Sequence, residues 1–220
     1  MENIFSDRIS DVPRLFIREI LKVAIDDSVI SFAGGLPNRD LFPLKEIKAA
    51  TNKVLDESGS EALQYSSSEG SIELRAWIAN RYKEKNNITI HPNNILITTG
   101  SQQGLDLLGK TFLNEKDNVI IEEPGYLGAI QAFSIYKATF SAIPLDTSGV
   151  NADGFAQALS NHNMKLFYCV PNFQNPSGIS YSEDNRKKIA SLLKEENTIL
   201  IEDRGGPRKS DSRIRCKIYD

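Results

Sequence analysis

From residue 95 onward, short apolar runs alternate with longer segments of helical periodicity, and this alternation limits the possible folds more than any other feature of the chain. Short runs rich in β-branched residues are typical of strands inside a parallel sheet. Strands joined through helices need crossover connections, which place helices on both faces of the sheet. We therefore predict an α/β fold with a mainly parallel sheet. The predicted strands are 95–99, 118–124, 139–145, 165–171 and 198–203, and the predicted helices are 100–113, 126–138, 152–162 and 182–197.

The part of the chain before residue 95 lacks this alternation. A stretch rich in glycine and proline, 31–43, predicts a loop. Apolar residues recur at helical spacing elsewhere, and we expect Trp77 and Tyr82 to be buried aromatic residues of one such helix. The helices predicted from this spacing are 11–25, 44–57 and 71–85.

Three regions follow from these patterns: an N-terminal arm over 1–43, a large domain over 44–203 and a basic tail over 204–220. The tail holds six basic and two acidic residues, whereas the whole chain carries a net charge of −3. It has neither strand nor helix periodicity, so we expect a solvated, disordered end. The overall charge gives no sign of a nucleic-acid partner.

The composition, 40% hydrophobic and 25% charged, is that of an ordinary globular protein, and 220 residues allow one sizeable domain. Cys169 and Cys216 form no spaced pair, which argues against a disulfide framework or a zinc site and favours the cytoplasm. We see no signal peptide and no apolar run long enough to span a membrane. His91 and His162 lie in polar, loop-like stretches, and we expect them to cap loops rather than to bind a metal.

Parallel strands place their ligands beyond their carboxyl ends, so the residues that follow each strand are the candidates for chemistry. After the first strand, Gly100 and Ser101 open a helix, and a helix start presents free N–H groups that suit a phosphate. The alternative is that Ser101 is a plain helix cap. After the second strand, Tyr126 could lie flat on a planar ligand, or it could be a core tyrosine.

The two later strands end in polar groups as well. Asn172 and Asn175 project from a turn that two prolines and a glycine fix, and each could donate to a ligand oxygen or cap its own turn. Asp203 ends the last strand and could pair with a protonated ring nitrogen. A phosphate site, a stacking ring, an amide donor and a carboxylate together suit one ligand, pyridoxal 5′-phosphate.

The chain also resembles a known family, the pyridoxal-phosphate-dependent class I and II aminotransferases of fold type I. It is similar in particular to the branch with 2-aminoadipate and kynurenine aminotransferases and the aminotransferase-like domain of MocR-type regulators. The resemblance runs from about Ile30 to Asp203, with the motifs in family order. They are SFAGGLPNRDLFP, LQYSSSEGSIELRAWI, ILITTGSQQGLDLL, IIEEPGYLGAIQAF, VPNFQNPSG and ILIED.

This resemblance implies a role for each matched residue. Two of them contact substrate or a second copy: Gly35 resembles a substrate-side backbone contact, and Tyr65 the tyrosine that reaches across a dimer interface to the neighbouring phosphate. The others contact the cofactor. Ser101 and Gln102 bind the phosphate, Tyr126 stacks on the pyridine ring, Asn175 donates to the phenolic oxygen and Asp203 pairs with the ring nitrogen.

The family pattern breaks after Asp203. Gly206 stands where relatives have a tyrosine, and the next strand, the Schiff-base lysine, the substrate-binding arginine and the small C-terminal domain have no counterpart. Lys209 and Lys217 sit in no matching motif. We therefore expect a C-terminally truncated, incomplete large domain that is inactive, and a poorly soluble or molten chain when it is expressed alone. A reading-frame shift or a natural short isoform would each explain the tail.

The resemblance implies an enzyme that exchanges an amino group between an α-amino acid and a 2-oxo acid, as a homodimer when complete, with no membrane or nucleic-acid partner. A non-catalytic, effector-sensing domain of a MocR-type regulator is the second hypothesis. An inert fragment is the third. Other chemistries of fold type I, such as β-elimination, use the same scaffold and stay open.

Overall fold

The computed structural model describes residues 4, 6–10, 37–161, 163–204 and 214–217. Two compact units make up the chain, one formed by Met1–Pro13 with Thr98–Asp220 and the other by Arg14–Ile97. The first holds the sheet, and the described part of the second is helical. The predicted helix over 11–25 lies outside the described residues.

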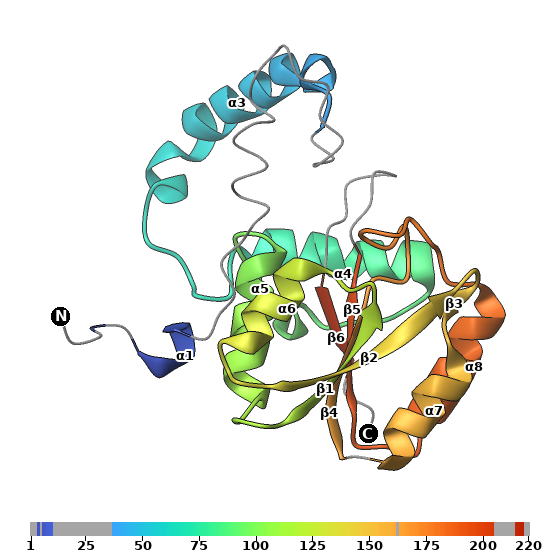
Figure 1. The fold of residues 1–220 in the computed structure, drawn as a ribbon. Coiled ribbons are helices and arrows are strands. Elements are labelled where there is room, and N and C mark those ends of the chain that lie inside the picture. Colours follow the sequence, from blue (N-terminus) through green and yellow to red (C-terminus); the bar gives the residue numbers. More distant parts are fainter. Residues whose placement is uncertain (1–3, 5, 11–36, 162, 205–213, 218–220) are drawn as a thin grey trace, which may run out of the picture. The chain divides into compact units, whose positions relative to one another are not determined.

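The sheet has six strands in the order β3-β2-β1-β4-β5-β6 (Figure 1). β1 (Asn118–Glu123) pairs in parallel with β2 (Thr139–Asp146) and with β4 (Met164–Cys169), and β4 pairs in parallel with β5 (Ile199–Asp203). The predicted α/β fold with a mainly parallel sheet is confirmed, and every strand predicted after residue 100 is present.

Two cores lie on opposite faces of the sheet, because side chains alternate along each strand. On one face, α5 (Ser101–Phe112) and α6 (Leu127–Ser134) bury Leu105 and Phe133 against β1, β4 and β5. On the other face, α7 (Ala152–Asn161) and α8 (Glu183–Leu193) bury Phe155 and Leu193. Full burial of one such side chain stabilises the fold by about 1.5–3 kcal/mol.

The two edges of the sheet differ from the prediction. β3 (Gly149–Val150) pairs antiparallel with β2 and has no counterpart among the predicted strands. β6 (Ile214–Lys217) pairs antiparallel with β5, so the expectation of a disordered tail is wrong for these residues. β5 would otherwise present a row of unpaired N–H and C=O groups, and four residues of the tail satisfy them.

The strand predicted over 95–99 is absent from the described structure. Ile95 does have an extended backbone, with φ −122° and ψ 125°, and the N–H of Ile97 donates to the carbonyl oxygen of Glu69 at 3.0 Å. β-branched residues favour the extended backbone, but a strand also needs a neighbouring strand with which to form a ladder. The described residues supply none for this segment.

The second unit contains η1 (Arg39–Leu41), α3 (Leu44–Ala62), α4 (Ile72–Asn86) and η2 (Pro92–Asn94), whereas the first also contains the short α1 (Asp7–Ser10). α3 continues beyond the predicted residue 57, with non-helical angles at Ser58. α4 begins after Ser71, whose hydroxyl accepts from the N–H of Leu74. Tyr82 is buried as predicted, but Trp77 is 57% exposed, so its predicted burial is wrong. Helical spacing cannot tell which flank of an apolar face finds a packing partner.

Candidate functional site

The carboxyl ends of β1, β4 and β5 lie at the same edge of the sheet because the three strands run parallel. Asp203 is the last residue of β5, and the segments that follow β1 and β4 carry Tyr126 and Asn175. α5 begins with Ser101 and Gln102. One strand therefore ends in a candidate residue and two lead into one within six residues, which is the arrangement expected of a ligand site in an α/β protein.

The start of α5 is open rather than capped. Gly100 occupies the cap position with a φ of 88°, which a glycine adopts without strain, and no side chain caps the helix. Ser101 is the first residue inside the helix, so the alternative that it is a plain cap is wrong. A Cβ added at Gly100 would meet none of the described residues within 4 Å. The helix thus presents free N–H groups and a hydroxyl beside open space, which suits an anion.

Gln102 ties α5 to α6. Its Nε2 donates to the carbonyl oxygen of Gly128 at 3.1 Å. A Cβ at Gly128 would lie 2.7 Å from Tyr126 Cζ and 2.8 Å from Gln102 Oε1, so Gly128 lets these two side chains lie side by side. The backbone of the first turn of α6 therefore fixes the positions of the Gln102 and Tyr126 side chains.

Tyr126 is partly a core tyrosine, as one of the two predicted alternatives has it, and its stacking on a ligand stays a prediction. It precedes α6, is partly buried, and packs against the core that α5 and α6 cover. Burial raises the pKa of its phenol, and the negative charge of Asp203 raises it further. The core therefore fixes the position of the ring, and the ring lies close enough to Asp203 for the carboxylate charge to raise the phenol pKa. The ring is partly exposed at the sheet edge.

Asp203 is a buried carboxylate, 6% exposed, at the end of β5. The hydroxyl of Tyr168 donates to its Oδ2 at 2.9 Å. Burial raises the pKa of Asp203, while the hydrogen bond from Tyr168 lowers it. Burial also raises the pKa of Tyr168 strongly, followed by the charge of Asp203, so the phenol stays protonated and donating. Sequence reasoning missed Tyr168 because it considered only residues beyond the strand ends.

The turn that carries Asn175 is held by its neighbours. Gln174 Oε1 accepts from the N–H of Ser177 at 2.8 Å, so Gln174 caps the turn, and the two alternatives for Asn175 stay predictions. Asn172 Oδ1 accepts from Arg186 Nη2 at 3.0 Å, which fixes the orientation of this amide, and its donation to a ligand stays a prediction. Asn175 is exposed, so its side chain is accessible to a ligand.

A second buried carboxylate, Glu122, was not predicted. It is 1% exposed, on β1, and receives three hydrogen bonds. Its Oε1 accepts from the Tyr181 hydroxyl at 2.6 Å and from the N–H of Val170 at 3.0 Å, and its Oε2 accepts from Gln174 Nε2 at 3.1 Å. Burial raises the pKa of Glu122 against the effect of these donors. The sequence held one signal, the acidic pair Glu122–Glu123 that follows three apolar residues in the same strand.

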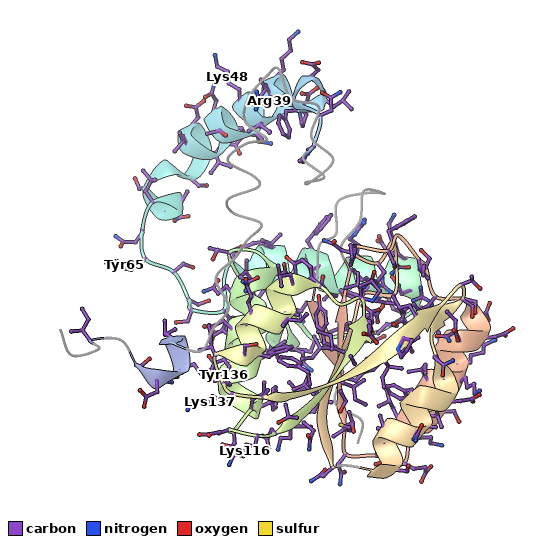
Figure 2. The ribbon with its side chains drawn as sticks, viewed as in Figure 1. Arg39, Lys48, Tyr65, Lys116, Tyr136 and Lys137 are labelled. Atoms are coloured by element: carbon purple, nitrogen blue, oxygen red, sulfur yellow. The ribbon has the colours of Figure 1, made fainter. Side chains whose placement is uncertain are left out.

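The remaining predicted residues belong to other parts of the chain. Tyr65 belongs to the second unit and is fully exposed on the segment after α3 (Figure 2). Gly35 and Lys209 lie outside the described residues, as does the side chain of Lys217. The roles assigned to Tyr65 and Gly35 stay predictions.

Other expectations concern metals and membranes. His91 Nδ1 accepts from the N–H of Asn93 at 3.2 Å, which confirms it as a cap, and His162 lies outside the described residues. Within the described ranges, no group of three or more His, Cys, Asp or Glu side chains could hold a metal ion. None of the helices described is both long and apolar enough to cross a bilayer.

Fold and site together define an α/β protein that presents an open helix start, a tyrosine, an amide and a buried carboxylate at one sheet edge. The sequence profile of aminotransferase class I and II matches residues 28–204. The chain therefore belongs to the class I and II aminotransferase family, with the fold type I architecture.

Similar proteins include enzymes and a regulator. The chain is 38% identical to aromatic-amino-acid aminotransferase 1 of Thermococcus litoralis over 207 residues, covering 92% of this chain and 50% of that protein. The crystal structure of LysN, α-aminoadipate aminotransferase from Thermus thermophilus complexed with N-(5′-phosphopyridoxyl)-L-leucine, matches with a TM-score of 0.81 and 38% identity, covering 90% and 48% of the two chains. The HTH-type transcriptional regulator YdcR of Escherichia coli K12, uncharacterised, is 30% identical over 189 residues, covering 86% of this chain and 40% of that protein. The chain spans about half the length of the curated relatives it matches.

Proposed function

We propose that this chain is the cofactor-binding part of a pyridoxal-phosphate-dependent aminotransferase, which exchanges an amino group between an α-amino acid and a 2-oxo acid. The buried Asp203 carboxylate at the sheet edge is the observation that carries the proposal. A buried carboxylate is costly unless it is paired. Tyr168 occupies Oδ2, and a protonated ring nitrogen would be a partner for Oδ1.

The described residues fit the rest of the cofactor. Ser101 and the N–H groups at the start of α5 would hold the phosphate, because the helix start is open and uncapped. Tyr126 would lie against the ring, and Asn175 would donate to the phenolic oxygen. Gln102 would contribute at the phosphate end while its Nε2 holds the α6 backbone.

Pyridoxal phosphate, when bound, supplies the electron sink and the amino-group carrier of transamination. The residues described here bind and orient it. Asp203 would keep a proton on the ring nitrogen through its negative charge, and Tyr168 fixes the orientation of that carboxylate at 2.9 Å. We assign the covalent lysine to no residue of this chain, so we propose binding without catalysis for these 220 residues.

An effector-sensing domain of a MocR-type regulator is the second candidate, and the 30% identity to YdcR supports it. The cofactor site would then serve to sense a ligand. Both candidates share cofactor binding, and an attached DNA-binding domain in the complete gene product would distinguish them. In the enzyme, Gly35 would contact substrate. Tyr65 would reach the phosphate of a second copy, so we propose a homodimer. We also propose that the protein acts in the cytoplasm.

The proposal is tested by titrating the purified 220-residue chain with pyridoxamine 5′-phosphate in a calorimeter, which measures the heat of binding. This probe carries an amine in place of the aldehyde and so forms no adduct with surface lysines. We expect saturable binding that inorganic phosphate weakens. A parallel sample with pyridoxal phosphate and borohydride, examined by mass spectrometry, should show no single modified lysine.

Absence of pyridoxamine phosphate binding would contradict the proposed cofactor site. Stoichiometric trapping on one lysine would contradict the assignment of binding without covalent attachment, and would identify the residue responsible.

A further inference from the structure

We propose that Gln174, anchored on Glu122, is a positioning residue that sets the places of Tyr126 and Asn175 for cofactor binding. This inference rests on the proposed function. The side-chain amide of Gln174 joins the two loops that carry these candidates, and Glu122 holds the amide from the other face of the sheet.

Every hydrogen-bonding group of the Gln174 amide has a partner. Nε2 donates to Glu122 Oε2 at 3.1 Å and to the carbonyl oxygen of Pro124 at 2.7 Å. Oε1 accepts from the N–H of Ser177 at 2.8 Å. The residue is 1% exposed, so none of these bonds is exchanged for water without cost.

These partners lie in both loops of the site. Pro124 is two residues before Tyr126 on the loop from β1 to α6, and Gln174 is the residue before Asn175 on the loop after β4. The backbone of Gln174 is fixed as well, since its N–H donates to the carbonyl oxygen of Ile179 at 2.8 Å. The side-chain amide of Gln174 therefore sets the separation between the loop that carries Tyr126 and the loop that carries Asn175.

Glu122 faces away from the cofactor site. Ile121 packs in the core under α5 and α6, the side from which Tyr168 reaches Asp203, whereas Ile120 packs in the core under α7 and α8. Alternation along β1 puts Glu122 on the side of Ile120. Its contact with Tyr181, a member of that second core, agrees. Glu122 thus acts on the site through Gln174 and not by contact with a ligand.

The experiment compares pyridoxamine 5′-phosphate affinity of the full 220-residue chain with that of Gln174→Met. Methionine keeps the length of the side chain but loses all three hydrogen bonds, so Pro124 and Ser177 are released. We expect the dissociation constant to rise by more than about fivefold, as for lost buried hydrogen bonds. If this variant does not fold by circular dichroism, Gln174→Asn, which keeps an amide on a side chain one methylene shorter, is measured instead.

A double-mutant cycle separates positioning from a general loss of stability. If Gln174 acts by placing Asn175, its substitution costs less affinity in an Asn175→Ala background than in the parent. Thr198→Val is the matched control. Thr198 is 3% exposed and donates one hydrogen bond to the carbonyl oxygen of Met164 at 2.8 Å, at the opposite end of β4 and β5. The Thr198→Val variant should have a lower unfolding free energy than the parent and the same affinity for pyridoxamine 5′-phosphate.

Three outcomes decide the matter. A loss above about fivefold that shrinks in the Asn175→Ala background supports the positioning role. A smaller loss, or one that is additive with Asn175→Ala, overturns it while the parent's binding upholds the proposed function. A parent that binds no pyridoxamine phosphate overturns both.

Discussion

At the scale of single residues, two buried carboxylates bear on both stability and chemistry. Burial is the largest influence on Asp203 and Glu122, and it raises the pKa of each. The folded state therefore binds these protons more tightly than the unfolded state. Their contribution to stability is fully present below the unfolded carboxyl pKa of about 4 and is lost as the pH rises through the folded pKa.

Asp203→Asn tests this at one site. The amide does not ionise, so we expect the unfolding free energy of the variant relative to the parent to increase from pH 4.5 to pH 7. Affinity for pyridoxamine phosphate should fall by about 2 kcal/mol, as for a lost hydrogen bond to a charged group. Urea unfolding at the two pH values and calorimetry measure the two effects. A stability difference that does not change with pH would show that burial does not perturb this carboxyl.

At the scale of elements, two serines at helix starts have different roles, one in capping its helix and the other in the proposed phosphate site. Ser182 caps α8, since its hydroxyl accepts from the N–H of Asn185 at 3.1 Å. Ser101 lies inside the first turn of α5, which no side chain caps. A helix cap contributes to stability, whereas an uncapped start leaves its N–H groups to a ligand.

The two alanine variants should therefore behave oppositely. Ser182→Ala should lower the unfolding free energy by about 1 kcal/mol and leave pyridoxamine phosphate binding unchanged. Ser101→Ala should leave the unfolding free energy within about 0.5 kcal/mol and weaken binding. Urea unfolding and calorimetry on both variants check this, and equal destabilisation by the two substitutions would refute the assignment at α5.

At the scale of the whole molecule, the chain exposes many large apolar side chains. No residue of the 19-residue helix α3 is buried, and Leu44, Ile47 and Val54 are each about half exposed or more. Trp77 on α4 is 57% exposed. Exposed apolar surface on this scale favours association with another surface.

We therefore expect the isolated chain to self-associate and to bind the dye ANS. Light scattering and dye fluorescence measure these properties. Leu44→Lys with Ile47→Lys on α3 should reduce both, whereas Lys45→Glu on the same helix, a change of one charge for another, should not. A monomeric chain that binds no dye would contradict the prediction.

The sequence alone determined the α/β class, the parallel strands after residue 100 and the helices between them, because periodicity and β-branched runs are local properties. It also identified Ser101, Tyr126, Asn175 and Asp203, since ligands in such folds gather beyond strand ends. Their roles toward a cofactor stay proposals.

Only the tertiary structure decided which segments pair and which polar groups meet. Ile95 is extended, yet 95–99 forms no ladder with any strand of the described residues, and the tail supplies β6, because a ladder depends on the neighbouring strand and not on local preference. Tyr168, Gln174 and Glu122 escaped prediction for the same reason. Each gains its role from hydrogen-bond partners about 30 to 60 positions away along the chain.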